Sequence, residues 1–385
     1  MFFSIDKTAQ DNFSNHYTLG PFVVSTDSGW QQTAIGNCQI VYKGYANETN
    51  LESALADIVV ATEPVLTGNF CAIVFNGTTI AIKSDRYRGF PIFVGDQTVT
   101  NLITHNKKIW ADTLIQFDHN FDLAETQFDV IGPIDVTEIS EAEAVAAIDK
   151  ILSQHIQNFL SHNTLPVKAF LSGGVDSALV YSYIQKYSNN FELLKYTHVD
   201  YDSFWLMNSG TIKENFWGYW QVHHFVEPCV VTSGTPGDEF MLRSPVTADL
   251  LLKYHGIYLT DVLAKPESKS CMMYSYFMKD KNYKIFKEQQ LDPTTDQAKV
   301  FWNLANIVIN DFQHWHIGNT LTLTLLRDIE IFKILLRLPP DALLRQVMNC
   351  DISVQLMNQN TPGISKCISE QKNTGNFLKN LVNLY

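Results

Sequence analysis

The feature that most constrains the fold is a glycine-rich loop placed directly between a buried strand and a helix. The apolar run 167–171 favours a strand, and a helix is expected over Asp176–Tyr187. The loop between them reads Ser172-Gly173-Gly174-Val175-Asp176-Ser177. In open α/β folds such a loop lies at the carboxyl edge of the sheet, where ligands bind. The pattern therefore predicts an α/β domain with a ligand site at this loop.

The residue types in this loop suit a phosphate group. Glycines let backbone amides come close to phosphate oxygens, and the N-terminus of the following helix favours negative charge. Ser172 and Ser177 can supply hydroxyl donors. Asp176 carries the same sign of charge as a phosphate, so we expect it to act through a bound Mg²⁺. The loop alone predicts a magnesium and phosphate site.

The rest of the C-terminal half alternates helical and strand patterns. Ser140 and Glu143 match a capping box at the start of an apolar-periodic helix that runs through Leu160. Further strands are expected at 193–199, 222–226 and 230–232, and the chain after residue 296 is expected to be largely helical. This alternation predicts a parallel sheet covered on both faces by helices.

The N-terminal third shows short apolar runs separated by turn residues, which is typical of a mainly β region. The turn Asn76-Gly77 joins two of these runs as a hairpin, and Leu51–Ala61 is expected to be a short helix. The predicted strands lie at 22–25, 38–42, 70–75, 79–83, 92–94 and 99–103.

A polar stretch over residues 118–138, with Gly132-Pro133 within it, separates these two patterns. We therefore expect a first domain over 1–120, a linker over 121–139 and a second domain over 140–385. A length of 385 residues fits two domains.

Charge and cysteine usage exclude some classes of protein. The chain has 40 acidic and 28 basic residues, a net charge of −12, which disfavours extensive nucleic-acid binding. The six cysteines show no spacing suited to zinc and are expected to be reduced thiols. Residues 1–14 lack a secretory pattern and no apolar run is long enough for a membrane span, so a soluble cytoplasmic protein without membrane contact is expected.

The hexapeptide SGGVDS after a strand resembles the signature of the PP-loop ATP pyrophosphatases, which cleave ATP between the α and β phosphates. Within that family, residues 231–240 (VTSGTPGDEF) resemble the SGxGxDE loop of asparagine synthetases and β-lactam synthetases. The resemblance implies that Asp238 binds Mg²⁺ and pyrophosphate together with Asp176. We also assign Val199, Ser233 and Gly234 to the ATP site.

Two later segments resemble further elements of the same family. The segment 325–339 resembles a helix that opens with "PFLD", which places Asp328 on an aspartate near the acceptor. The segment 368–377 resembles the RxKxGF element, with its glycine shifted by one, and this implies that Lys372 stabilises charge between adenylate and pyrophosphate. Thr235 stands where asparagine synthetases have a glutamate that handles the amine, and a threonine hydroxyl is a poor general base.

The N-terminal third resembles the glutaminase domain of this family, an N-terminal-nucleophile (Ntn) hydrolase αββα sandwich. The matching segments are 40–45 (IVYKGY), 68–73 (GNFCAI) and 85–93 (DRYRGFPIF). Glutamine hydrolysis there needs a cysteine at position 2, but this chain has Phe2, and Lys43-Gly44-Tyr45 replaces the "NGE" that helps to hold glutamine. The domain is therefore expected to lack glutaminase activity.

Together these resemblances imply an N-terminal Ntn-like sandwich and a C-terminal PP-loop parallel sheet, similar to adenine nucleotide α-hydrolases, with a helical C-terminal part. The implied activity is an ATP- and Mg²⁺-dependent amide ligase that adenylates a small carboxylate and uses ammonia or another amine. A β-lactam-synthetase-like cyclase, a catalytically retired nucleotide-binding homologue and a tRNA-modifying enzyme remain alternatives. The acceptor, the amine and homodimer formation stay open.

Overall fold

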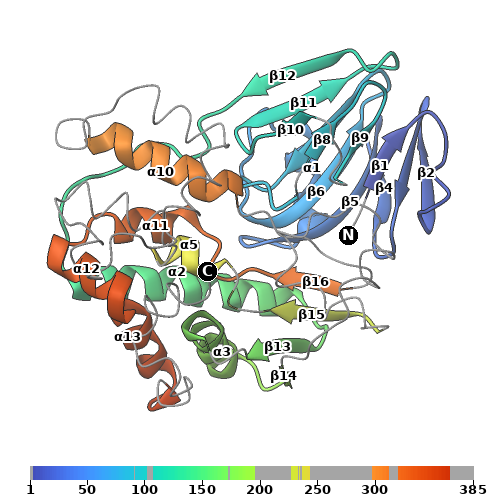
Figure 1. Ribbon diagram of the computed structural model, residues 1–385. Helices are drawn as coiled ribbons and strands as arrows, with labels where there is room; N and C mark the ends of the chain where they lie inside the picture. The colour runs from blue at the N-terminus through green and yellow to red at the C-terminus, as the bar shows by residue number, and fades with distance from the viewer. Residues whose placement is uncertain are drawn as a thin grey trace, which may run out of the picture.

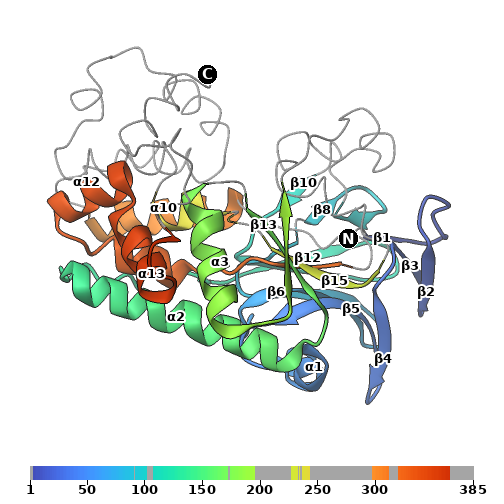
Figure 2. The ribbon, with the colours of Figure 1, turned by 90° about the horizontal axis from the view of Figure 1, so that it is seen from below.

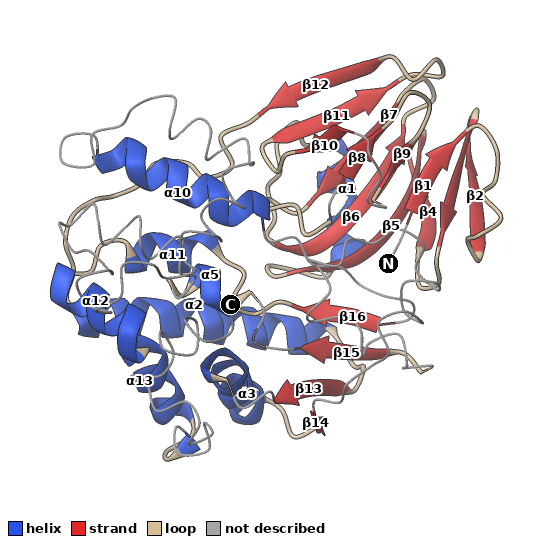
Figure 3. Cartoon of the chain, viewed as in Figure 1, coloured by secondary structure: helices blue, strands red, loops and turns tan. Residues whose placement is uncertain are grey.

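Three β-sheets organise the chain in the computed structural model, two antiparallel ones in its N-terminal part and a parallel one in its C-terminal part (Figure 1). The structure describes residues 3–90, 92–101, 107–171, 174–195, 227–232, 234, 236–242, 297–311 and 320–364. Strands dominate the N-terminal part and helices the C-terminal part, as Figure 3 shows. The predicted change from a β-rich to an α/β region is therefore confirmed.

The two antiparallel sheets pack face to face over an apolar core. The first has the order β10-β8-β9-β1-β3-β2 and the second β12-β11-β7-β6-β5-β4. Their bounds are β1 (Phe3–Asp6), β2 (Asn15–Leu19), β3 (Phe22–Thr26), β4 (Gln31–Ile35), β5 (Cys38–Ala46), β6 (Gly68–Phe75), β7 (Ile80–Ser84), β8 (Ile92–Val94), β9 (Val99–Thr100), β10 (Lys107–Ile109), β11 (Thr113–Phe117) and β12 (Leu123–Gln127).

Alternation of side chains along the strands fills both faces of the second sheet. Val41 and Ile73 point into the core between the sheets, whereas their neighbours Ile40 and Val74 pack with helix α1 (Leu51–Val60). Asn76 and the following glycine close the predicted hairpin between β6 and β7. Among the described residues between 3 and 139, α1 is the one helix, so two stacked sheets and a single helical layer of the expected αββα sandwich are seen.

The predicted linker contains a strand. Leu123–Gln127 forms β12, which pairs with β11 at the edge of the second sheet. Most of this strand is exposed, so its sequence lacks the apolar alternation that marks a half-buried strand. Beyond it, Val130 and Ile131 are buried in the C-terminal core. The chain between the two parts is thus packed against both of them.

The parallel sheet has the order β14-β13-β15-β16, with every neighbouring pair parallel. Figure 2 shows the long helix α2 beside α3 and α13 on one side of it. The strands are β13 (Val167–Leu171), β14 (Phe191–Lys195), β15 (Cys229–Thr232) and β16 (Thr320–Leu323). The helices are α2 (Glu141–His162), α3 (Val175–Tyr187), α5 (Gly237–Phe240), α10 (Gln297–Asp311), α11 (Ile329–Leu335), α12 (Pro340–Asn349) and α13 (Asp351–Asn360).

Several sequence predictions are confirmed in this part. The capping box of Ser140 and Glu143 is present, and the apolar face of α2 is buried. The strand predicted at 193–199 begins earlier, at Phe191, and the strand predicted at 222–226 lies outside the described residues. Within the described residues, the cysteines at 38, 71, 229 and 350 are free thiols. None of the described helices is long and apolar enough to cross a membrane.

The helix predicted over 325–339 begins later than expected, and a strand precedes it in a stretch that was expected to be largely helical. Residues 320–323 form β16, and α11 begins at Ile329. The helix starts there because the Asp328 side chain accepts a hydrogen bond from Glu330 N and so caps it. Leu325 and Leu326 are buried in the turn before the helix. The apolar periodicity of the sequence did not show that a strand and a turn precede the helix.

Candidate functional site

The strand order of the parallel sheet places a crevice between β13 and β15. From β13 the chain moves to β14 on one side, and β15 then lies on the other side. Open parallel sheets bind ligands at such a switch point, outside the carboxyl ends of the two strands that flank it. Both glycine-containing loops that the sequence singled out follow these two strands.

The first loop leads from β13 into α3. Gly174 is the N-cap residue of α3 and brings no side chain to the helix terminus, while Asp176 lies in the first turn and is partly buried. The Ser177 hydroxyl donates to Gly174 O at 3.0 Å, so its proton is engaged within the loop. Val175 is buried and belongs to the core. Ser172 and Gly173 lie outside the described residues.

The second loop rests directly on the first. A Cβ atom placed on Gly234 would collide with Ser177 N and would lie 2.5 Å from Asp176 C, and one placed on Gly237 would lie 2.5 Å from Asp176 Cγ. Contacts this short with backbone mean that a side chain at Gly234 could be accommodated only if the first loop moved. The two loops, 57 positions apart from Ser177 to Gly234, are therefore brought into van der Waals contact.

Two carboxylates belong to this crevice. Asp176 lies on the first loop and Asp238, which is exposed, lies in the short helix α5 that follows the second. Carboxylate oxygens suit Mg²⁺, which keeps several water or phosphate oxygens in its shell. No group of three or more metal-ligating side chains occurs among the described residues, so an Mg²⁺ here would take its remaining ligands from the nucleotide and water. The carboxylate oxygens of these two residues are suitable ligands for the Mg²⁺ of a magnesium–nucleotide complex.

Asp328 lies beyond the carboxyl end of the next strand, β16, as a buried side chain. Its Oδ1 accepts from Glu330 N at 2.8 Å and from the Tyr87 hydroxyl at 3.4 Å, and its Oδ2 lies 3.4 Å from His155 Nε2. Burial raises the pKa of Asp328 to about 6, although the hydrogen bond from Glu330 N opposes this. Burial lowers the pKa of His155 to about 4. At neutral pH a carboxylate therefore faces an uncharged imidazole.

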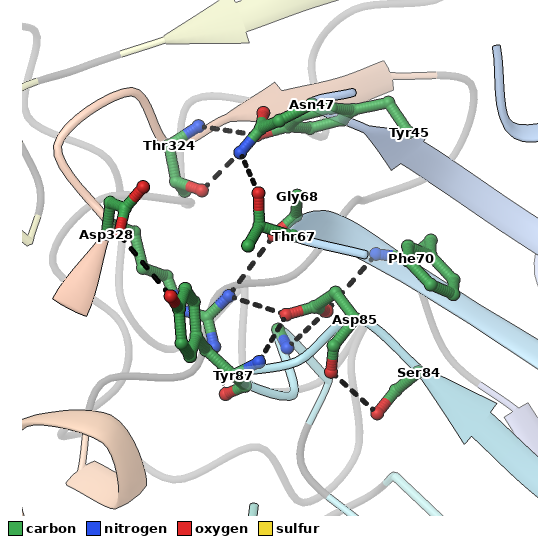
Figure 4. A network of polar contacts seen from close by, with 12 residues as sticks. Tyr45, Asn47, Thr67, Gly68, Phe70, Ser84, Asp85, Tyr87, Thr324 and Asp328 are labelled. Atoms are coloured by element: carbon green, nitrogen blue, oxygen red, sulfur yellow. Dashed lines mark hydrogen bonds and ion pairs between the residues drawn. The ribbon is translucent and has the colours of Figure 1, made fainter. Parts of the chain in front are cut away.

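Residues of the N-terminal part surround the turn that carries Asp328 (Figure 4). Arg327 pairs with Asp85 at 3.2 Å, and both side chains are 0% exposed. Arg327 also donates to Gly68 O and Tyr87 O, and Tyr45 OH lies 3.1 Å from Thr324 N. A buried charge pair of this kind is destabilising when one partner is removed.

No sequence pattern predicted this network of buried polar contacts. Arg327 and Asp328 stand in a mostly apolar run, LTLTLLRDIEIF, and adjacent opposite charges in such a run are a signal of a buried ionic contact. His155 stands on the apolar face of α2 beside Leu152 and Ile156, which is a second signal. The partners Asp85 and Tyr87 are more than 200 positions away in sequence, so no local pattern joins them.

A cavity of about 330 Å³ lies at the opposite edge of the parallel sheet, between the two parts of the chain. Leu165, Pro228 and Thr320, at the amino ends of β13, β15 and β16, line it from one side, and Lys43 of β5 lines it from the other. Lys43 is buried and donates to Ser28 O at 2.7 Å, and burial lowers its pKa to about 8. The strands separate this cavity from the glycine-containing loops.

The structure brings Asp176, Ser177 and Gly234 together, and Asp238 follows on the same loop as Gly234. Asp328 lies at the same edge of the sheet but contacts Tyr87 and His155. The remaining predicted site residues, Val199, Ser233, Thr235 and Lys372, lie outside the described residues, as does Phe2.

No known protein family matches this sequence, and no curated protein is significantly similar to it. Several solved structures are similar to part of the chain, and two of them are described here. The glutamine phosphoribosylpyrophosphate amidotransferase from B. subtilis, complexed with ADP and GMP, has 11% identity and a TM-score of 0.24, over 60% of this chain and 69% of that chain. A structure described as the allosteric regulatory enzyme of purine biosynthesis has 11% identity and a TM-score of 0.23, over 60% and 68%. At TM-scores this low, the similarity shows neither a shared fold nor a shared activity.

Proposed function

We propose that this chain is an ATP-dependent, AMP- and pyrophosphate-forming amide ligase of the asparagine-synthetase type. Its C-terminal part would be a PP-loop domain, and its N-terminal part an Ntn-like sandwich without glutaminase activity. The observation that carries the proposal is the contact of Gly234 and Gly237 with Asp176 and Ser177 at the switch point of a parallel sheet. This contact supports a joint role for two loops that the sequence had linked to one family.

In the proposed reaction, a carboxylate oxygen of the acceptor attacks the α-phosphorus of ATP, and pyrophosphate leaves. An amine then attacks the acyl carbon of the adenylate, loses a proton, and AMP leaves. Mg²⁺, when bound, would neutralise negative charge on the triphosphate. Asp176 and Asp238 would hold it, and the backbone of the first loop would approach the phosphates.

The identity of the nucleotide products tests this proposal. Purified protein with ATP, Mg²⁺, ammonium and a panel of small carboxylates is expected to form AMP and pyrophosphate, and Asp176→Ala is expected to abolish turnover. Asp57→Ala, which alters an exposed side chain of α1, is the matched control and should keep full activity. Formation of ADP and phosphate would refute the assignment. Tight ATP binding without turnover would instead support the retired, nucleotide-binding homologue.

The proposed residues should divide between the two chemical steps. Asp238→Asn and Lys372→Ala are expected to slow adenylate formation by about 10² to 10³, the usual cost of losing one electrostatic contact to a developing charge. Thr235→Ala should leave adenylate formation largely intact and reduce amide formation. Equal loss of the first step in Thr235→Ala and Asp238→Asn, with both proteins folded, would refute this division of roles.

The nitrogen source can be tested separately. Because Lys43-Gly44-Tyr45 replaces the "NGE" that helps to hold glutamine in the glutaminase domains that this part resembles, glutamine should be neither hydrolysed nor used as the nitrogen donor. Measured release of glutamate by the purified protein would overturn this part of the proposal. In that case glutamine would be the nitrogen donor in place of free ammonia or another amine, and the proposed reaction with ATP would stay the same.

A further inference from the structure

The turn between β16 and α11, residues 324–328, is held mainly by side chains from the N-terminal part. Thr324 N donates to Tyr45 OH at 3.1 Å, and the Tyr87 hydroxyl donates to Asp328 Oδ1 at 3.4 Å (Figure 4). Arg327 reaches into the N-terminal part to pair with Asp85. One turn of the C-terminal part is thus fixed at three points by residues from another region of the chain.

The partner of Arg327 is itself immobilised. The Asp85 carboxylate accepts from three backbone amides, Phe70 N at 3.3 Å, Tyr87 N at 3.1 Å and Gly89 N at 2.7 Å. A carboxylate with several fixed donors keeps one orientation, so the arginine that pairs with it is fixed as well. The N-terminal part therefore presents a rigid receptor for Arg327.

The other side of the same turn touches the crevice. A Cβ atom on Gly237 would lie 2.7 Å from Leu326 Cδ1 and 2.5 Å from Asp176 Cγ. The turn thus packs on the second loop, which packs on Asp176. A continuous series of contacts leads from Asp85 and Tyr87 of the N-terminal part to the proposed phosphate loop.

We infer that the N-terminal part positions the acceptor side of the crevice, with Tyr87 as a positioning residue for the Asp328 carboxyl group. This inference rests on the proposed function, in which Asp328 lies near the acceptor. Tyr87 donates to the same oxygen that caps α11, and His155 faces the other oxygen, so both oxygens of the carboxyl group have fixed neighbours. The N-terminal part would thus have a structural role in the proposed reaction even without glutaminase activity.

Tyr87→Phe tests this inference because it removes one hydroxyl and keeps the ring. Two readouts are needed. The first is hydrogen exchange at the Glu330 amide, which donates to Asp328 Oδ1 and should lose protection by about tenfold when the carboxyl group is released. The second, in the active protein, is the KM for the acceptor carboxylate, which should rise by about tenfold while the KM for ATP stays unchanged.

Tyr17→Phe is the matched control. Its hydroxyl donates to Trp30 O at 3.0 Å within the N-terminal part, and its loss should change neither readout. Should Tyr87→Phe fail to fold, Asp328→Asn probes the same bond from the other side, and protection at Glu330 is again the measure. In the double variant, the losses of protection should be smaller than the sum of the two single effects.

The two readouts separate failure of this inference from failure of the proposed function. If no carboxylate supports ATP turnover by the wild type, the proposed function fails, and hydrogen exchange still decides whether Tyr87 positions Asp328. Unchanged protection at Glu330 in Tyr87→Phe would overturn the inference. So would equal changes in the KM values for acceptor and ATP, because a general loss of structure would affect both substrates alike.

Discussion

The loop after β15 and the turn after β16 follow neighbouring parallel strands at the same edge of one sheet. They differ in whether their charged side chains are exposed or buried. The loop after β15 contains glycines that lie on Asp176, and its own Asp238 is exposed. The turn after β16 contains the buried charge of Arg327, whose partner Asp85 comes from the N-terminal part. A ligand needs close backbone approach and accessible charge, whereas a fixed geometry needs buried, fully partnered charge.

This difference suggests how one sheet edge can serve two purposes. The exposed carboxylate is accessible to Mg²⁺ that a nucleotide brings with it, while the buried turn keeps one arrangement whether or not a ligand is present. Substitutions in the turn should therefore mainly change the free energy of unfolding. Substitutions in the loop should mainly change nucleotide affinity, with a smaller effect on stability.

The largest effect is expected for Arg327→Ala. The change leaves Asp85 buried without its cation, and breaking a buried pair in this way costs about 3–5 kcal/mol of unfolding free energy. The matched control is Arg345→Ala, whose ion pairs with Glu141 and Asp351 are more exposed and should contribute less than about 1 kcal/mol. Denaturant unfolding measures both. Similar losses of unfolding free energy in the two variants would contradict the distinction between the buried pair of Arg327 and the more exposed pairs of Arg345.

The next effect concerns the pH dependence of stability. The pKa of Asp328 is raised in the folded state from 3.8 to about 6, so its protonated form contributes stability that is full below pH 3.8 and is lost as the pH rises through 6. Raising a pKa by about 2 corresponds to about 3 kcal/mol. Asp328→Asn should therefore gain stability relative to the wild type, by up to this amount, as the pH rises from 4 to 7.

His155 acts in the opposite direction, so the wild type alone does not show the effect of Asp328. Its folded pKa is lowered from 6.5 to about 4, and its contribution is full above pH 6.5 and is lost as the pH falls through 4. The two contributions partly cancel in the wild type. The comparison of unfolding free energies for Asp328→Asn and wild type at each pH isolates the carboxyl group. Parallel curves would show that Asp328 is not in the buried environment described.

The smallest effect is expected for Gly234→Ala in the loop after β15. The added methyl group would collide with Ser177 N and Asp176 C, and overpacking of this kind costs about 1–3 kcal/mol. Because the collision displaces the first loop, binding of ATP with Mg²⁺ should weaken at least about tenfold. Gly36→Ala is the control. Its φ of +57° strains an alanine and should lower stability, but nothing lies within 4 Å of a Cβ there, so nucleotide affinity should not change. Unchanged nucleotide affinity in Gly234→Ala would contradict the proposal that the two loops form one nucleotide site.

Local patterns predicted much of this structure. SGGVDS after a strand placed β13 and α3, and Ser140 with Glu143 placed the start of α2, because capping and periodicity act over a few residues. The short strand β16 was missed because it has only four residues, and no glycine or proline in residues 324–328 marks its end before α11. β12 was missed because an exposed edge strand has no apolar face.

The candidate site was predicted only where the chain itself carries a motif. Asp176, Gly234 and Asp238 stand in recognisable loops, and their convergence follows from the order of the parallel strands. The contacts of Asp328 with Tyr87 and His155 join residues that no periodicity relates. Packing between distant parts of the chain decides such contacts, so the sequence offered only the signal of charges within an apolar run.

Exchange of labelled pyrophosphate into ATP is the most direct test of the central claim, that the two converged loops form a site that adenylates a carboxylate. The measurement reports the first chemical step before the amine is known. Wild-type protein and Arg345→Ala should catalyse exchange that depends on Mg²⁺ and on one carboxylate of the panel, and Asp176→Ala should not. Exchange by Asp176→Ala at the wild-type rate, or none by a wild type that binds ATP across a broad carboxylate panel, would contradict the claim.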